Sequence, residues 1–396
     1  MQNGYLRLVA GLTSTMALRP PPALSKAGRH LSWLMSLTLL FAPAGSAQQS
    51  AVDFQSLVQG ATAAREENDL PRAIEMYRQA VALNGGWSDG WWYLGLLQYA
   101  TDSYVPARDA LTHFIQLSPN AGPAIALRGL CEFELGEYPS ALQDVERGIA
   151  AGAANDPHNQ EILLYHEALL RARTGDFEGA IDAYARFVKT ESTNPELFVA
   201  IGLAGLQKPL LPSDLPADQV PLFKQTGQAG YAYLQGDQSA AEQAFEKLFQ
   251  RYPTTPNLHY FYAYLLLAVD PAAASAQLRD ELQVAPTNEA ALLLAGWADM
   301  LQSKYKEGLT YARRALEIHP GMPMAELEMG RCLVETGEVR QGIQYLDKID
   351  AVQPNNLEVH LAYVVAYEAE NRPADARRER LLCLKLARQE VGVGSQ

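Results

Sequence analysis

The sequence has few basic residues relative to its acidic residues. Its 396 residues include 45 aspartates and glutamates but only 32 lysines and arginines. Four of the basic side chains and none of the acidic ones lie in the first 47 residues, so the remainder carries 28 basic and 45 acidic residues, a net charge of −17. Such a surface repels phosphate backbones and anionic lipids, which argues against nucleic acid or an anionic membrane surface as the main partner.

Catalytic and metal-binding motifs are also missing. The sequence has no phosphate-binding glycine loop and no nucleophile elbow. His166 and Glu167 begin a zinc-helix motif, but Leu170 stands where the second histidine would be. His158 precedes His166 by eight residues, a spacing that does not favour a shared metal ion. We therefore expect a protein that is not an enzyme, with no cofactor and no metal site.

The N-terminal residues have the pattern of a targeting segment. Lys26 and Arg29 precede an apolar run over residues 31–45, and small residues follow as far as Ala47. The run is about 15 residues long, shorter than the roughly 20 that a transmembrane helix needs. The pattern predicts a signal peptide over residues 1–47, cleaved after Ala47, which leaves no integral membrane span. The chain would then be exported, to a periplasmic or extracellular location; an uncleaved leader that anchors the chain is the alternative.

After this leader the sequence repeats itself, and most of the steps are 34 residues long. We number the positions within a repeat as slots 1 to 34. The same slots hold Trp91, Leu94, Gly95, Ala107, Leu111 and Pro119; then Leu292, Ala295, Gly296, Gly308, Ala312, Ala315 and Pro320; then Glu326, Met329, Gly330, Gly342, Leu346, Ile349 and Pro354. The repeats start near Phe54, Ser88, Gly122, Glu161, Pro195, Leu222, Pro256, Glu289, Pro323 and Leu357.

This pattern resembles the tetratricopeptide repeat family. That family has a large residue at slot 4, Leu-Gly or Leu-Ala at slots 7 and 8, alanine at slots 20 and 27, an aromatic residue at slot 24 and proline at slot 32. The resemblance covers nearly the whole chain after residue 47. It implies an all-α fold, a right-handed α-solenoid of about nine to ten helix-turn-helix repeats, in which each repeat buries its apolar face only against its neighbours.

The chemistry of individual slots supports this interpretation. Small residues at slots 8 and 20 let the two helices of a repeat approach closely. Four glycines stand where the first helix should end, before an acidic residue at the start of the second: Gly136, Gly175, Gly236 and Gly337. Cys131 and Cys332 share slot 10 six repeats apart, too far to pair in a solenoid, and Cys383 lies on the final helix. We expect all three cysteines to be small buried apolar residues.

Two irregular stretches interrupt the period. Residues 150–160 add a few positions, which we interpret as a longer loop. Residues 207–221 contain four prolines, which exclude a regular helix. We therefore divide the chain into an N-terminal array over 48–206, a proline-rich insertion over 207–221 and a C-terminal array over 222–396. The insertion either packs its leucines on the helix before it or acts as a recognition arm or lid.

The resemblance also implies a binding surface, because tetratricopeptide arrays bind extended peptides or helices on the concave face through slots 2, 5, 9, 12 and 13 of the first helices. Here those slots are apolar and aromatic, a composition that suits partner binding. They hold Trp92, Leu96, Tyr99, Leu130, Phe133, Ile162, Tyr165 and Leu169 in repeats two to four, and Tyr233, Tyr260, Tyr264, Leu293, Trp297 and Met300 in later repeats. The alternative is that these side chains pack on adjacent first helices.

The sequence thus predicts a non-enzymatic scaffold or adaptor that holds a protein or peptide partner in an apolar groove. The family's Lys and Asn clamp for chaperone C-termini is absent, since slots 5 and 9 hold Val58 and Thr62 in the first repeat. Three alternatives are a structural subunit of a cell-envelope assembly or secretion complex, a carbohydrate-binding protein and an unrecognised enzyme. Self-association is a further expectation, because solenoid ends are open.

A basic cluster on the last helix is either a solvated cap or a docking site for an acidic partner; it consists of Arg377, Arg378, Arg380, Lys385 and Arg388.

Overall fold

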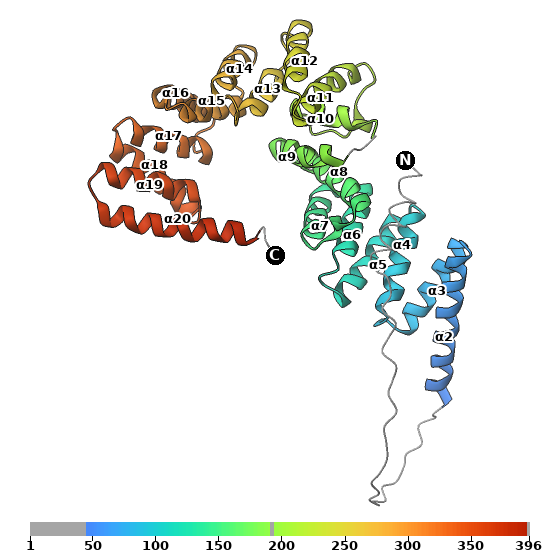
Figure 1. Cartoon of the computed structure of the whole chain (residues 1–396). Helices are drawn as coiled ribbons and strands as arrows, with labels where there is room; N and C mark the ends of the chain where they lie inside the picture. The colour runs from blue at the N-terminus through green and yellow to red at the C-terminus, as the bar shows by residue number, and fades with distance from the viewer. Residues whose placement is uncertain (1–44, 191–193, 394–396) are drawn as a thin grey trace, which may run out of the picture. The chain divides into compact units, whose positions relative to one another are not determined.

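The structure is a computed structural model that describes residues 45–190 and 194–393 (Figure 1). These residues form 19 α-helices and three short 3₁₀ helices, with no strand among them. The all-α prediction is therefore confirmed, and the helices follow one another as the antiparallel pairs of an α-solenoid. None of the described helices has both the length and the apolar character that crossing a bilayer requires. The predicted signal peptide lies almost wholly outside the described residues and stays a prediction.

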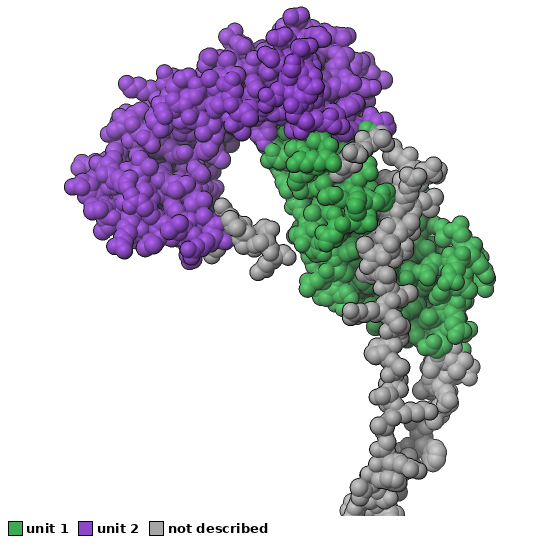
Figure 2. Space-filling view, viewed as in Figure 1, with its two compact units in different colours: residues 1–194, 208–211 green, residues 195–207, 212–396 purple. Residues whose placement is uncertain are grey.

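The chain divides into two compact units (Figure 2). Unit 1 comprises residues 1–194 and 208–211. Its described elements are α2 (Gly45–Glu66), α3 (Leu70–Leu83), α4 (Ser88–Ala100), α5 (Tyr104–Leu117), α6 (Gly122–Glu134), α7 (Tyr138–Ala150), η1 (Ala153–Asn155), α8 (Pro157–Thr174), α9 (Phe177–Phe187) and η2 (Val188–Thr190).

Unit 2 comprises residues 195–207 and 212–396. Its described elements are α10 (Leu197–Gly205), η3 (Pro212–Asp214), α11 (Val220–Leu234), α12 (Gln238–Arg251), α13 (Leu258–Leu266), α14 (Pro271–Val284), α15 (Glu289–Leu301), α16 (Tyr305–Ile318), α17 (Pro323–Glu335), α18 (Val339–Val352), α19 (Leu357–Ala369) and α20 (Pro373–Val393). Five first helices begin at the residue that the period predicts: α4, α6, α15, α17 and α19.

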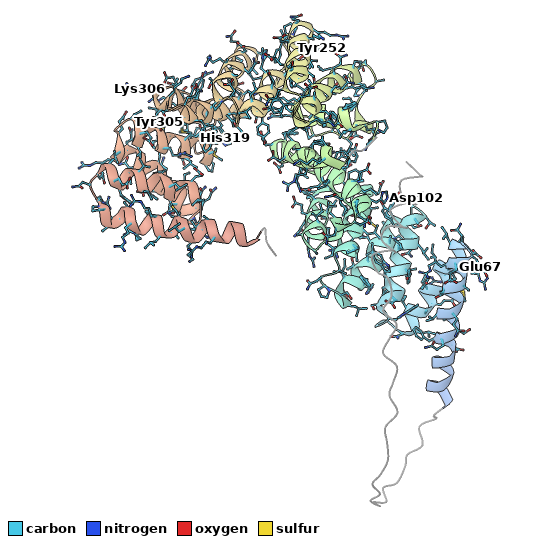
Figure 3. The ribbon with its side chains drawn as sticks, viewed as in Figure 1. Glu67, Asp102, Tyr252, Tyr305, Lys306 and His319 are labelled. Atoms are coloured by element: carbon cyan, nitrogen blue, oxygen red, sulfur yellow. The ribbon has the colours of Figure 1, made fainter. Side chains whose placement is uncertain are left out.

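The turn between the two helices of a repeat has one recurring backbone feature. Slot 15 is left-handed in eight repeats, with φ between 55° and 93°. Glycine occupies it at the four predicted positions, where it costs no steric strain. The other four repeats use Asn68, Asp102 (Figure 3), Ser303 and Asn371. Asparagine and aspartate tolerate this conformation better than other residues with a Cβ, which leaves Ser303 as the most strained of the eight.

Replacing Ser303 with glycine should therefore stabilise the C-terminal repeats. We expect S303G to raise the unfolding free energy by about 1 kcal/mol, because it relieves left-handed strain at an exposed position. The midpoint of urea unfolding, followed by circular dichroism, measures the change. Ser303→Ala is the control and should give no gain; a midpoint for S303G at or below that of the parent chain would contradict the strain argument.

The structure corrects the interpretation of residues 150–160 as a simple loop. The stretch contains η1, and α8 already begins at Pro157. Asp156 caps α8 by accepting hydrogen bonds from the backbone N–H groups of His158, at 3.0 Å, and Asn159, at 3.2 Å. The added residues therefore lengthen both the first helix of the fourth repeat and the connection before it, part of which is helical.

Helix α10 precedes the proline-rich insertion, and its main packing partner is the helix that follows the insertion. Within unit 2, α10 packs most extensively against α11, and η3 adds a smaller contact. Two glycines allow the close approach, since a Cβ at Gly227 would overlap the carbonyl oxygen of Phe198 and one at Gly202 that of Phe223. Of the insertion's leucines, Leu215 is buried. Most of the packing on α10 comes from α11, however, and not from the insertion.

The contact between α10 and α11 should tolerate no side chain at Gly227. We expect Gly227→Ala to lower the unfolding free energy by about 3 kcal/mol, because the added methyl group forces two backbones apart. Gln228→Ala, an exposed neighbour on the same helix, serves as the control and should be neutral. Equal urea midpoints for the two variants would show that the helices are not in the close contact described.

Candidate functional site

The structure buries eight of the fourteen predicted groove residues and leaves the other six half-buried. Trp92, Leu96, Tyr99, Leu130, Tyr165, Leu169 and Tyr260 are each at most 9% exposed. Phe133, Ile162, Tyr233, Tyr264, Leu293 and Trp297 are half-buried, and Met300 is buried. A buried side chain offers no surface to a peptide in this structure. The binding role of the set stays a prediction, but only its half-exposed members are accessible.

In unit 1 the buried side chains contact the second helix of their own repeat. The Trp92 ring lies 5.6 Å from that of Phe114, and the Tyr99 ring lies 5.7 Å from that of Tyr104. Leu96 and Leu130 belong to the same apolar cluster as these aromatic residues. The rings therefore fill the space beside α4, and the leucines at slot 9 are covered as a result.

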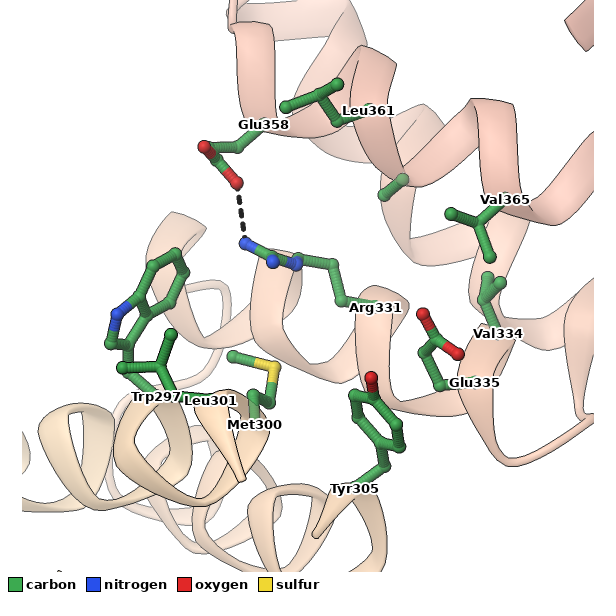
Figure 4. Close-up of a pocket in the computed structure, with 11 residues that line it drawn as sticks. Trp297, Met300, Leu301, Tyr305, Arg331, Val334, Glu335, Glu358, Leu361 and Val365 are labelled. Atoms are coloured by element: carbon green, nitrogen blue, oxygen red, sulfur yellow. Dashed lines mark hydrogen bonds and ion pairs between the residues drawn. The ribbon is translucent and has the colours of Figure 1, made fainter. Parts of the chain in front are cut away.

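Unit 2 has an open hollow at the equivalent slots, between α15, α17 and α19 (Figure 4). Its volume is about 170 Å³. The lining residues are Trp297, Met300, Leu301, Tyr305, Arg331, Val334, Glu335, Glu358, Leu361, Ala362 and Val365. All of them except Tyr305 and Ala362 occupy slots 2, 5, 9, 12 or 13 of their repeats. We call this hollow the C-terminal groove.

Three large apolar side chains of the C-terminal groove are exposed. Leu301 is 51% exposed, Leu361 44% and Val365 38%. They come from two of the three first helices that line the groove: Leu301 ends α15, and Leu361 and Val365 lie along α19 (Figure 4). Covering them with an apolar partner would remove unfavourable contact with water, at roughly 25 cal/mol per Å² of apolar surface.

A polar contact spans the same groove. Arg331 on α17 donates a hydrogen bond from Nη1 to Oε2 of Glu358 on α19, at 2.7 Å. Its guanidinium carbon lies 4.7 Å from the centre of the Trp297 ring on α15, which is cation–π geometry. One arginine thus ties three first helices together. Because Glu335 also lines the groove, two carboxylates face one cation.

Sequence reasoning found Trp297 and Met300 but missed the other half of the C-terminal groove. Its list of candidates ended in the repeat that starts at Glu289. The same slots in the next two repeats hold Arg331, Glu358, Leu361 and Val365. Applying the slot rule to the last two repeats would have found all four.

The described residues contain no group of three or more histidine, cysteine, aspartate or glutamate side chains that could hold a metal ion. His166 is half-buried, and its Nδ1 lies 2.8 Å from the carbonyl oxygen of Ile162. All three cysteines are buried and free. Burial raises the pKa of the Cys332 thiol to about 12, so this side chain is neutral at physiological pH and unsuited to nucleophilic chemistry.

Two of the buried carboxyl groups, Glu132 and Glu328, have clearly raised pKa values. Glu132 on α6 is 8% exposed, and burial, with the nearby Asp144 carboxylate, raises its pKa to about 7. Asp144 itself pairs with Arg128 through Nε, at 2.5 Å, and Nη2, at 2.9 Å. Glu328 on α17 is 2% exposed, and burial raises its pKa well above the ordinary value. Both groups resist ionisation in the folded chain.

The raised pKa of Glu132 should make unit 1 less stable in alkaline solution. The folded state holds this proton more tightly than the unfolded state, so its stabilising effect is complete below about pH 4.5 and is lost as pH rises through 7. We expect E132Q to be more stable than the parent at pH 8 by about 3 kcal/mol and similar at pH 4.5. Urea unfolding across this range tests it, and parallel pH profiles for the two proteins would contradict it.

Comparison with known proteins places these repeats in a family. Three models described as "Tetratricopeptide repeat" match residues 58–122, 228–255 and 299–356. The chain is a tetratricopeptide repeat protein. Such repeats generally mediate protein–protein interaction, and the last match includes part of the C-terminal groove.

Individual relatives of this tetratricopeptide repeat protein are distant. It is 32% identical to "Protein CTR9 homolog" of Arabidopsis thaliana over 82 residues, which is 20% of this chain and only 8% of that protein. The crystal structure of MamA is 16% identical over 43% of this chain and 94% of its own, with a TM-score of 0.38. Yeast Tom70 is 13% identical over 84% of this chain and 99% of its own, with a TM-score of 0.35.

Proposed function

We propose that this chain is a non-enzymatic scaffold or adaptor that holds an extended peptide or a helix of a partner protein in the C-terminal groove. The observation that carries the proposal is the group of exposed apolar side chains, Leu301, Leu361 and Val365, around the Arg331–Glu358 ion pair. Apolar anchors beside a few fixed polar groups are what a recognition groove needs for affinity and orientation. The leader pattern supports export as the setting in which the partner is met.

The charges of the groove favour a cationic partner segment. Arg331 is already paired with Glu358 and stacked on Trp297, so its charge is largely offset. Glu335 adds a second, exposed carboxylate to the lining. A peptide with a lysine or arginine beside an apolar side chain would match this lining. Its basic residue would lie near Glu335, and its apolar side chain between Leu361 and Val365.

A second candidate function, a structural subunit of a cell-envelope assembly, is supported by a different observation. Leu381 and Leu384 are 61% and 58% exposed on α20, at the end of the array. In that function the contact surface is the end of the solenoid, and the groove is not required.

Groove binding can be tested with selected peptides. We would select binders to the intact chain from a random peptide library and measure their affinities by fluorescence anisotropy. We expect sequences with a basic residue beside apolar ones, and at least tenfold weaker binding to Leu361→Asp and Val365→Asp, because each places a charge where an apolar side chain must be buried. Glu335→Lys should weaken the binding of the cationic peptides in particular.

The matched control is Val352→Asp, a substitution at a 67% exposed apolar residue of α18 outside the groove. It should leave peptide affinity unchanged. Circular dichroism spectra must coincide for all variants. Selected peptides that bind Leu361→Asp and Val365→Asp as tightly as the parent would place recognition elsewhere and overturn the proposal.

A further inference from the structure

The last helix, α20, presents an apolar strip to solvent. Leu381 and Leu384 line a shallow hollow together with Lys385 and Arg388, and Arg377 is exposed one turn earlier. Terminal repeats of a solenoid normally carry a polar outer face, because nothing stacks on them. Two exposed leucines on such a face therefore call for a covering element.

In earlier repeats the same face is covered by the first helix of the next repeat. Slot 28 holds Val81 and Ile115, which are only 3% and 7% exposed, whereas Leu384 occupies slot 28 in the last repeat. Val81 contacts slot 3 of the following repeat, since a Cβ at Gly90 would lie 2.7 Å from its Cγ1. A residue at slot 28 thus packs against a small residue at slot 3.

Two further contacts join consecutive repeats at defined slots. Slot 25 meets slot 7, because Arg128 donates to the Thr112 hydroxyl at 3.3 Å and the Tyr363 hydroxyl donates to Asp347 at 2.7 Å. Slot 21 meets slot 16, because Arg108 Nη1 donates to Glu137 at 2.8 Å. These slots fix what a helix covering α20 must offer.

For α20, slots 21, 25 and 28 hold Arg377, Leu381 and Leu384. An acidic residue at slot 16 of the covering repeat would pair with Arg377, and small residues at slots 7 and 3 would leave room for the large side chains of Leu381 and Leu384. The first repeat of this chain has all three. They are Asp69, Gly60 and Ser56, of which Asp69 and Ser56 are exposed. Asp69 and Glu137 hold equivalent positions, because each is the N-cap residue immediately before its helix, α3 and α7 respectively.

We propose that the chain associates head to tail, with α20 of one copy packed against α2 of the next. The contact continues the stacking of repeats from one copy into another. Leu384 lies on Ser56, Leu381 lies on Gly60, and Arg377 pairs with Asp69 as Arg108 pairs with Glu137.

Charge and helix length both suit this arrangement. The exposed residues at the C-terminal end of α2 and just after it include Glu66 and Glu67, of which Figure 3 labels Glu67; in an antiparallel contact they lie towards the N-terminal half of α20, where Arg377 is exposed. Helices α2 and α20 have 22 and 21 residues, and no other described helix exceeds 18. Because a second helix and the next first helix run antiparallel, the extra turns of α20 at its C-terminus and of α2 at its N-terminus would lie side by side.

Sedimentation velocity of the purified full chain, with and without residues 1–47, tests the proposal over a range of concentrations. We expect species that grow with concentration and that high salt weakens only a few-fold, because salt screens the ion pair but not the apolar contact. Leu384→Glu should block the α20 face and Ser56→Arg the α2 face, each weakening association at least about thirtyfold by burying a charge in an apolar contact. Val269→Glu, at another exposed apolar residue, should leave association unchanged.

Mixing the two blocked variants gives the sharpest result. Each retains one working face, so the mixture should form a 1:1 dimer and nothing larger, while each variant alone stays monomeric. Arg377→Glu and Asp69→Arg should each weaken association about two- to fivefold, and combining them in one chain should restore it. A parent chain that is monomeric at all concentrations, or association unaffected by Leu384→Glu and Ser56→Arg, would overturn the proposal.

Discussion

The close approach of neighbouring helices is the constraint on which the rest of this structure depends. Within a repeat, a Cβ at Gly95 would lie 2.7 Å from Leu111, and one at Gly330 would lie 2.9 Å from Leu346. Small residues at these crossings let the two helices of a repeat pack closely, and each repeat then stacks mainly on its neighbours. Stacking of this kind aligns the first helices along one face within each unit, and among the described residues it leaves the outer face of α20 uncovered. The groove and the exposed end of α20 are both consequences of that geometry.

Much of the fold could be predicted from sequence because the repeat fixes both helix boundaries and turn conformation. Slot 15 shows this well, since Gly136 and Gly337 were recognised as turn residues and the structure places both in the left-handed region. The pairing of α10 with α11 could not be predicted. Gly202 signals a close contact, but its partner helix lies beyond residues 207–221, which have no period from which to continue the register.

The candidate site shows a different limit of the sequence pattern. Slots identify the face on which a side chain lies but not whether the face is filled. Leu96 and Val365 share slot 9, yet Leu96 is 1% exposed and Val365 38%. Beside Leu96, slots 5 and 12 hold the aromatic rings of Trp92 and Tyr99, whereas beside Val365 the same slots hold Leu361 and Glu368. Exposure depends on how neighbouring side chains pack, which the spacing of residues does not encode.

Thiol labelling most directly tests whether the face is closed in unit 1 and open in unit 2. Cysteine would be placed at slot 9 in Leu96→Cys, Leu130→Cys and Val365→Cys; the native cysteines are buried and give little background. The account predicts that Val365→Cys reacts at nearly the rate of a free thiol. Leu96→Cys and Leu130→Cys should react at least about a hundredfold more slowly, since a buried thiol reacts only when the structure opens. Similar rates at all three positions would contradict the account.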